Sequence, residues 1–180
     1  HGQNAEGMQA LNGPKLAGQS AWYLKRQIKA YQTGQRGVHE GDIYGQQMAP
    51  MASTLATEAS IDNVVAHIQS LPDTPAPTTI SGDAASGAKI AVVCAYCHGA
   101  DGMGNQALNA PRYAGMSDWY LKRQLENFRS GARGAHPQDY YGMQMGFMGR
   151  ILNEDQAIAD LVAYINTLPV VGGEATAQTN

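Results

Sequence analysis

The sequence predicts an all-α fold in which two small tandem helical domains are joined by a proline-rich linker. Three observations lead to this prediction. The two halves of the chain repeat one another, apolar residues recur at helical spacing in each half, and no run alternates apolar and polar residues clearly enough for a strand. An apolar fraction of 43% in 180 residues is ordinary for a globular protein.

The repeat defines the domain organisation. Residues 1–72 align without a gap with residues 98–169, and 34 of the 72 positions are identical, which indicates an internal duplication. We therefore predict a first domain over 1–72, a linker over 73–83, a second domain over 84–170 and a flexible tail over 171–180. Three prolines within six residues favour an extended linker, and the tail has no apolar periodicity.

Each repeat contains two segments with a helical pattern. In the second repeat, Ser117 is the predicted N-cap of a helix that Gly131 ends, and Asn153 is the predicted N-cap of a helix that Pro169 ends. Their apolar faces consist of Leu121, Leu125 and Phe128, and of Ile158, Leu161, Val162, Ile165 and Leu168.

The first repeat predicts matching helices over Ser20 to Thr33 and Thr57 to Leu71. One further helix is expected over about 84–95, directly before the only two cysteines of the chain. The segments between these helices are rich in Gly, Pro and Met, and we expect them to be loops.

Charge and hydropathy exclude some functions. The net charge is −3 and no basic block is present, so the sequence predicts no nucleic-acid partner. No apolar run approaches the roughly 18 residues that a membrane span needs. No signal peptide is visible in the sequence as given.

The sequence "CAYCH", from Cys94 to His98, matches the C-x-x-C-H pattern of covalent haem attachment. Two thiols about one helical turn apart can reach the two vinyl groups on one edge of a porphyrin, and the adjacent imidazole can then bind the iron. A zinc site would need about four ligands, and no second cysteine pair supplies them. A thioredoxin-like redox pair would need a βαβ context, which is absent. A bare disulfide does not explain the following His-Gly.

Methionines are the candidates for the sixth iron ligand. Met48 recurs as Met145 and Met51 recurs as Met148, each just before the last helix of its repeat. Histidine–methionine ligation occurs in electron-transfer cytochromes and raises the reduction potential. His39 and His136 also recur, but they lie in polar loops, where a solvated histidine or a contact to a haem propionate is the simpler interpretation.

These motifs resemble class I cytochromes c, and specifically the two-haem cytochrome c4 type. The resemblance covers residues 1–170. It rests on "CAYCHGADGMG", on "NAPRYAG" and "NGPKLAGQ", on the "WYLKRQL" helix and on "MGFMGRILNEDQAIADLVAYINTLP". It implies two haem c groups, of which the second is attached through Cys94 and Cys97.

The resemblance also implies a ligand set. In the family the iron-binding Met lies seven residues before the Leu that leads into the final helix, which selects Met145 and Met48, with Met148 and Met51 in reserve. The iron would then be held by His98 and Met145 in the second domain, and by His1 and Met48 in the first. The carbonyl groups of Pro111 and Pro14 are expected to accept hydrogen bonds from these histidines and to orient them.

The function implied by the resemblance is one-electron transfer in the periplasm, by a soluble or membrane-associated protein that is not an enzyme. The implied partners are respiratory redox proteins: a quinol-oxidising complex as donor and a terminal oxidase as acceptor. Peripheral membrane association is compatible with this role. The alternatives are an electron-transfer subunit of a dehydrogenase and a two-haem peroxidase, although both repeats keep the methionine that a peroxidase would have to displace.

The first repeat departs from the family pattern, because its cysteines would lie four and one residues before His1, where the sequence as given has none. Either the given sequence is incomplete, or this half has lost its cysteines and His1 is a free N-terminus that could chelate copper. We favour incompleteness, because Met48, Pro14 and the helices keep their register.

Overall fold

The computed structural model describes residues 1–170, and in this range it consists of helices and loops without a named strand, which confirms the predicted all-α class. The predicted tail, 171–180, lies outside the described residues. The elements are α1 (Ala21–Gln32), α2 (Ile43–Ser53), α3 (Glu58–Gln69), α4 (Ala84–His98), α5 (Asp118–Ser130), α6 (Tyr140–Ile151) and α7 (Asp155–Ile165), with one-turn 3-10 helices η1 (Gln9–Leu11) and η2 (Gln106–Leu108).

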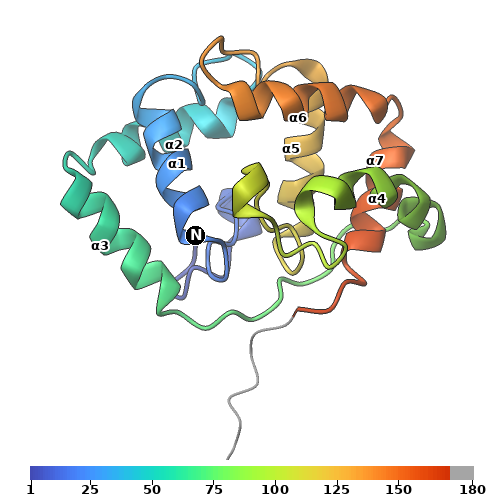
Figure 1. Ribbon diagram of the computed structural model, residues 1–180. Coiled ribbons are helices and arrows are strands. Elements are labelled where there is room, and N and C mark those ends of the chain that lie inside the picture. The colour runs from blue at the N-terminus through green and yellow to red at the C-terminus, as the bar shows by residue number, and fades with distance from the viewer. Residues whose placement is uncertain (171–180) are drawn as a thin grey trace, which may run out of the picture.

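The two repeats lie next to each other (Figure 1). The first repeat, with α1 to α3, occupies the left of the view, and the second, with α4 to α7, occupies the right. Helices α2 and α6 run along one edge, and the linker between α3 and α4 passes along the opposite edge. Within 1–170, no helix is both long enough and apolar enough to cross a bilayer.

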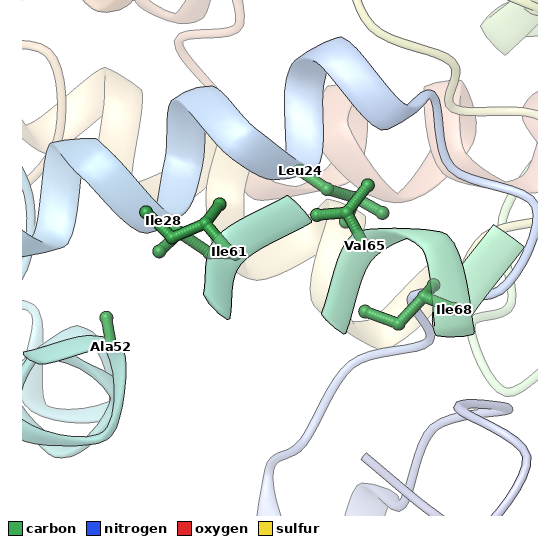
Figure 2. Close-up of a cluster of buried hydrophobic side chains, with 6 residues drawn as sticks. All are labelled: Leu24, Ile28, Ala52, Ile61, Val65 and Ile68. Carbon is green, nitrogen blue, oxygen red and sulfur yellow. The ribbon is translucent and has the colours of Figure 1, made fainter. Parts of the chain in front are cut away.

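Each repeat has its own hydrophobic core. In the first, aliphatic side chains of α1 and α3 pack together, with Ala52 of α2 beside them (Figure 2). In the second, α7 packs against α4 and α5, and Ile158 and Val162 are completely buried. The first core comprises Leu24, Ile28, Ala52, Ile61, Val65 and Ile68; the second comprises Ala91, Leu152, Ile158, Leu161, Val162 and Ile165.

Helices α2 and α6 occupy segments that we expected to be loops, so that expectation was wrong. Asp42 and Asp139 are their N-caps, and each carboxylate accepts a hydrogen bond from the backbone N–H three residues later. Pro50 lies inside α2. In α6, a Cβ atom at Gly149 would lie 2.9 Å from the backbone nitrogen of Arg129 on α5. The glycine therefore allows α6 to lie close against α5.

The ends of two other helices differ from prediction, and a third lacks the expected capping bond. The N-cap of α7 is Glu154 rather than Asn153, and α4 continues beyond Ala95 to His98. Ser117 does precede α5, but its hydroxyl does not cap the helix. Instead, it accepts a hydrogen bond from the backbone N–H of Lys15, in the other repeat, at 3.0 Å. The sequence of one helix cannot reveal such a contact between repeats.

Candidate haem sites and the contact between the repeats

Cys94, Cys97 and His98 form the last turn of α4, whose N-terminus is capped by Asp83. Cys94 and Cys97 form no disulfide; Cys94 is half-buried and Cys97 is exposed. Burial raises the pKa of the Cys94 thiol above its ordinary value. The helix thus places two thiols one turn apart, with an imidazole directly after them.

His98 is buried, with 8% of its surface exposed, and its Nδ1 lies 2.7 Å from the carbonyl oxygen of Pro111. Because a carbonyl can only accept, Nδ1 carries the proton and Nε2 keeps a free electron pair. Burial lowers the pKa of His98, although the bond to Pro111 acts in the opposite direction, so the ring stays neutral. A neutral imidazole held through one nitrogen is the form that binds a metal through the other.

His1 makes the same contact in the first repeat. Its Nδ1 lies 2.7 Å from the carbonyl oxygen of Pro14, and its own carbonyl accepts a hydrogen bond from the N–H of Gly7 at 2.7 Å. The equivalent bond in the second repeat runs from Gly104 to His98 at 2.8 Å. The His1 side chain is exposed, unlike that of His98. The loop that follows each histidine therefore has the same hydrogen bonding in both repeats.

Met145 and Met148 lie on α6 and line the same small apolar cavity as Cys94, with a volume of about 30 Å³. The structure thus brings both candidate methionines of the second repeat near the cysteine helix and does not choose between them. The full lining is Ile90, Val93, Cys94, Leu125, Met145, Met148, Ile151, Leu152 and Leu161.

The first repeat does separate its two methionines. Met48 is half-buried and packs against the core of α1 and α3, whereas Met51 is 59% exposed. Met48 is therefore the one whose thioether faces the interior of the repeat.

The donor set of the second repeat fits haem c. Two free thiols one turn apart, an imidazole with Nε2 available, and thioethers beside an apolar cavity are the groups that covalent attachment and iron ligation require. The cavity holds only about 30 Å³, so it is the donor set and the apolar lining that fit, rather than the free volume.

A further group of residues, which the sequence did not identify as an interface, joins the two repeats. Arg36 and Arg133 occupy equivalent positions, and both are buried. Arg36 Nη2 donates to Tyr120 Oη at 2.6 Å and to Gln124 Oε1 at 3.0 Å. Reciprocally, Arg133 Nη2 donates to Tyr23 Oη and to Gln27 Oε1, both at 2.9 Å. Both arginines are therefore interface residues and not solvated surface side chains.

These guanidinium groups change the electrostatics of the interface. Burial alone would raise the pKa of Tyr23, but the charges of Arg133 and Arg36 outweigh burial and lower it. The Nε of Arg36 is buried and has no hydrogen-bond partner. The tyrosines, glutamines and arginines of this interface lie in two sequence motifs that both repeats contain, "WYLKRQ" and Gly-x-Arg-Gly. This recurrence could have drawn attention to them, but it does not reveal that the residues of one repeat contact those of the other.

His39 and His136 lie beside this interface rather than among the predicted iron ligands. They line a cavity of about 260 Å³ between the two repeats, together with Arg36. The Nδ1 atoms of His39 and His136 accept hydrogen bonds from the N–H of Gly41 at 3.0 Å and of Gln138 at 3.2 Å. Each ring is thus held by its own loop.

The sequence model of the cytochrome c family matches residues 1–72 and again residues 84–169. The chain belongs to the cytochrome c family. The double match and the likeness to cytochrome c4 described below confirm the predicted two-haem class I cytochrome of the c4 type, whose cofactor is covalently bound haem c. One curated relative, the thiosulfate dehydrogenase electron acceptor of Stutzerimonas stutzeri, is 33% identical over an alignment of 178 positions that covers 92% of this chain and 76% of the relative.

Two solved structures extend the comparison. Reduced cytochrome c4 of Pseudomonas stutzeri superposes with a TM-score of 0.71 and 27% identity, over 94% of this chain and 91% of that one. The thiosulfate dehydrogenase TsdBA of Marichromatium purpuratum superposes with a TM-score of 0.71 and 30% identity, over 93% of this cytochrome but only 35% of the TsdBA chain.

Proposed function

We propose that this cytochrome is a periplasmic electron carrier that holds one haem in each repeat and passes single electrons between other redox proteins. The observation that carries the proposal is the repeated histidine arrangement. In both repeats Nδ1 is bonded to a proline carbonyl at 2.7 Å, which leaves Nε2 available for iron. A structural histidine would not need the same loop and the same tautomer twice.

In the proposed ligand set, His98 and Met145 hold the second iron, and His1 and Met48 hold the first. Bound haem supplies an iron that changes its charge by one electron. The residues of the chain bind it, exclude water from it and set its potential. With both axial positions filled by side chains, no position is left for a substrate, so we propose a carrier rather than an enzyme. Cys94 and Cys97 supply the covalent attachment.

The proposed electron donor is a thiosulfate-oxidising dehydrogenase. Support comes from the relative named as a thiosulfate dehydrogenase electron acceptor and from the superposition on part of the TsdBA chain. The quinol-oxidising complex that the sequence resemblance implies is the competing donor. The terminal oxidase that it implies is the proposed acceptor. Redox partners of this kind form small, short-lived interfaces.

Rapid mixing distinguishes the two donors. Oxidised holoprotein is mixed with thiosulfate and a thiosulfate dehydrogenase, or with a quinol and a quinol-oxidising complex, and haem reduction is followed by absorbance. We expect fast reduction only in the first mixture. Fast reduction only in the second would replace the donor, and turnover of thiosulfate or peroxide by the cytochrome alone would contradict the carrier function.

A further inference from the structure

Asp73, the first residue of the linker, lies between equivalent residues of the two repeats. Its Oδ1 is 2.7 Å from Nζ of Lys15, and its Oδ2 is 2.5 Å from Nη1 of Arg112. The side chain of Lys15 is completely buried and that of Arg112 is 4% exposed, whereas Asp73 retains 17% exposure. One carboxylate of the linker therefore serves two buried cations, one from each repeat.

Both cations also bind the opposite repeat. Lys15 Nζ donates to the carbonyl oxygen of Gly115 at 2.9 Å, and Arg112 Nη1 donates to the carbonyl oxygen of Gly18 at 2.8 Å. Glycines 18 and 115 are themselves equivalent positions, so the two contacts are reciprocal. The contact between the repeats at this edge thus depends on where these two side chains are held.

Asp73 is needed there because a buried cation without a counter-ion is strongly unfavourable. Burial lowers the pKa of Lys15 even though Asp73 is adjacent, and Arg112 Nη2 is buried without a partner. Gly18 leaves room for the carboxylate of Asp73, because a Cβ atom at position 18 would lie 2.2 Å from Asp73 Oδ1. The backbone of Gly18 also has a φ of +75°, which favours glycine.

These two cations directly follow the prolines that bind the histidines. The carbonyl of Pro14, which accepts from His1, and the N–H of Lys15, which donates to Ser117 Oγ at 3.0 Å, belong to one planar peptide group. In the second repeat, the carbonyl of Arg112 accepts from Gln19 Nε2 at 2.9 Å. The Pro14 carbonyl is therefore coupled directly to a contact across the interface, and the Pro111 carbonyl is coupled to one through the backbone of Arg112, the residue that follows it.

We infer that Asp73 is a positioning residue shared by both haem sites: by holding Lys15 and Arg112, it fixes the two proline carbonyls that orient His1 and His98. The inference rests on the proposed role of these histidines as iron ligands. One residue outside both repeats then affects both haems together. Loss of its negative charge also disfavours the oxidised iron, which raises both potentials.

The test compares the wild-type holoprotein with Asp73→Asn and Asp73→Glu. The control is Asp62→Asn, which removes the same charge from a 54% exposed carboxylate paired with Lys25. Two quantities are measured: the solvent exchange rate of each histidine Nδ1 proton, by NMR of the reduced protein, and each haem potential. We expect Asp73→Asn to speed both exchange rates and to raise both potentials, Asp73→Glu to stay close to wild type, and Asp62→Asn to change neither.

Three results would overturn the inference. The first is a lower unfolding temperature for Asp73→Asn with unchanged exchange rates and potentials. The second is a change at one haem only. The third is separation of the repeats in small-angle scattering, because lost packing would then explain both shifts. If the wild-type protein holds no haem that is ligated by these histidines, this result contradicts the proposed function and not the inference about Asp73.

If Asp73→Asn does not accumulate as holoprotein, Arg112→Lys replaces it. The lysine keeps the charge but lacks the planar group that reaches Asp73, Gly18 and the carbonyl of Ala114 together. We expect faster Nδ1 exchange at His1 as well as at His98. A change confined to His98 would show that Asp73 does not connect the two sites.

Discussion

The two repeats differ in what covers the histidine and agree in how it is held. In the second repeat α4 packs against α7, and His98 at the end of α4 is buried, whereas His1 in the first repeat is exposed. Yet Nδ1 lies 2.7 Å from the proline carbonyl in both. The comparison shows that the loop between histidine and proline holds the ring in the same way whether the ring is buried or exposed.

The loop conformation explains this agreement. Asn12 and Asn109 both have a left-handed backbone, with φ of 55° and 54°, and each follows a 3-10 turn of identical sequence. An isolated antiparallel bridge closes each loop, between residues 8 and 13 and between residues 105 and 110. These bonds lie within the loop, so they do not depend on a helix packed beside it.

The largest expected effect comes from the axial methionines, in both halves. Met145→Ala should abolish the weak far-red sulfur-to-iron absorption of the second haem and lower its potential, because the thioether ligand is lost. Met48→Ala should do the same for the first haem. Absorbance and redox titration of the oxidised holoprotein measure both.

Met148→Ala and Met51→Ala are the matched controls and should keep both bands. If Met148→Ala loses the band of the second haem and Met145→Ala keeps it, then Met148 and not Met145 is the ligand of the second iron. That comparison matters most there, because both side chains line the same cavity.

The next effect tests the two cores against each other. Ile61 and Ile158 are equivalent and have 2% and 0% of their surface exposed. Replacing either by Ala removes a buried side chain and leaves a cavity, which costs about 2–5 kcal/mol. We expect a loss in this range for both, because each side chain is almost fully buried in the core of its own repeat. Hydrogen exchange of the α3 and α7 amides measures the two halves separately, and a loss below about 1 kcal/mol for either variant would contradict the place of that residue in a packed core.

A smaller effect concerns Asp118, which attaches the linker to the second repeat and has Ala21 as its equivalent. Its carboxylate accepts from the N–H of Thr79 at 2.6 Å, from the N–H of Ile80 at 2.8 Å and from Asn166 Nδ2 at 3.1 Å. Asp118→Ala should lower the free energy of unfolding by roughly 3 kcal/mol, because buried donors lose their acceptor.

The same substitution should change the pH dependence of stability. Burial opposes ionisation of Asp118, but its hydrogen bonds from Thr79, Ile80 and Asn166 prevail and lower its pKa below the ordinary 3.8. A carboxylate with a lowered pKa stabilises the fold above its ordinary pKa, and this contribution is lost as the pH falls through the folded value. Asp118→Ala should therefore show a flatter loss of stability below about pH 4. An unchanged acid limb in denaturant titrations would contradict this assignment.

The smallest effect is expected at the surface of the first repeat. Lys25 and Asp62 form an ion pair in which both side chains are exposed, at 43% and 54%. Asp62→Asn should lower the free energy of unfolding by less than about 1 kcal/mol. The difference should disappear in high salt, where exposed charges are screened. A loss as large as that of Asp118→Ala would mean that surface charge contributes as much as the buried linker contacts.

Apolar periodicity and capping residues predicted the helices that have clear apolar faces, but they did not predict α2 and α6. Pro50 inside α2 and the glycines at 142, 146 and 149 of α6 lower helix propensity, and packing against α1 and α5 overrides it. The cysteine–histidine motif was readable because its spacing alone carries the chemistry. The contacts of Arg36, Arg133 and Asp73 were not, because they join residues far apart in the chain, and a single sequence contains no signal for such pairs.

The reciprocal bonds of Arg36 and Arg133 have a consequence for how such a molecule can change over evolutionary time. Each guanidinium group donates hydrogen bonds to a tyrosine and a glutamine of the other copy, so each copy depends on the other for these hydrogen bonds. Arg36 also donates to Gln27 of its own copy, and Arg133 donates to Gln124. Loss of one partner leaves a buried charge with fewer hydrogen bonds, so positions 23, 27, 36, 120, 124 and 133 are expected to vary together.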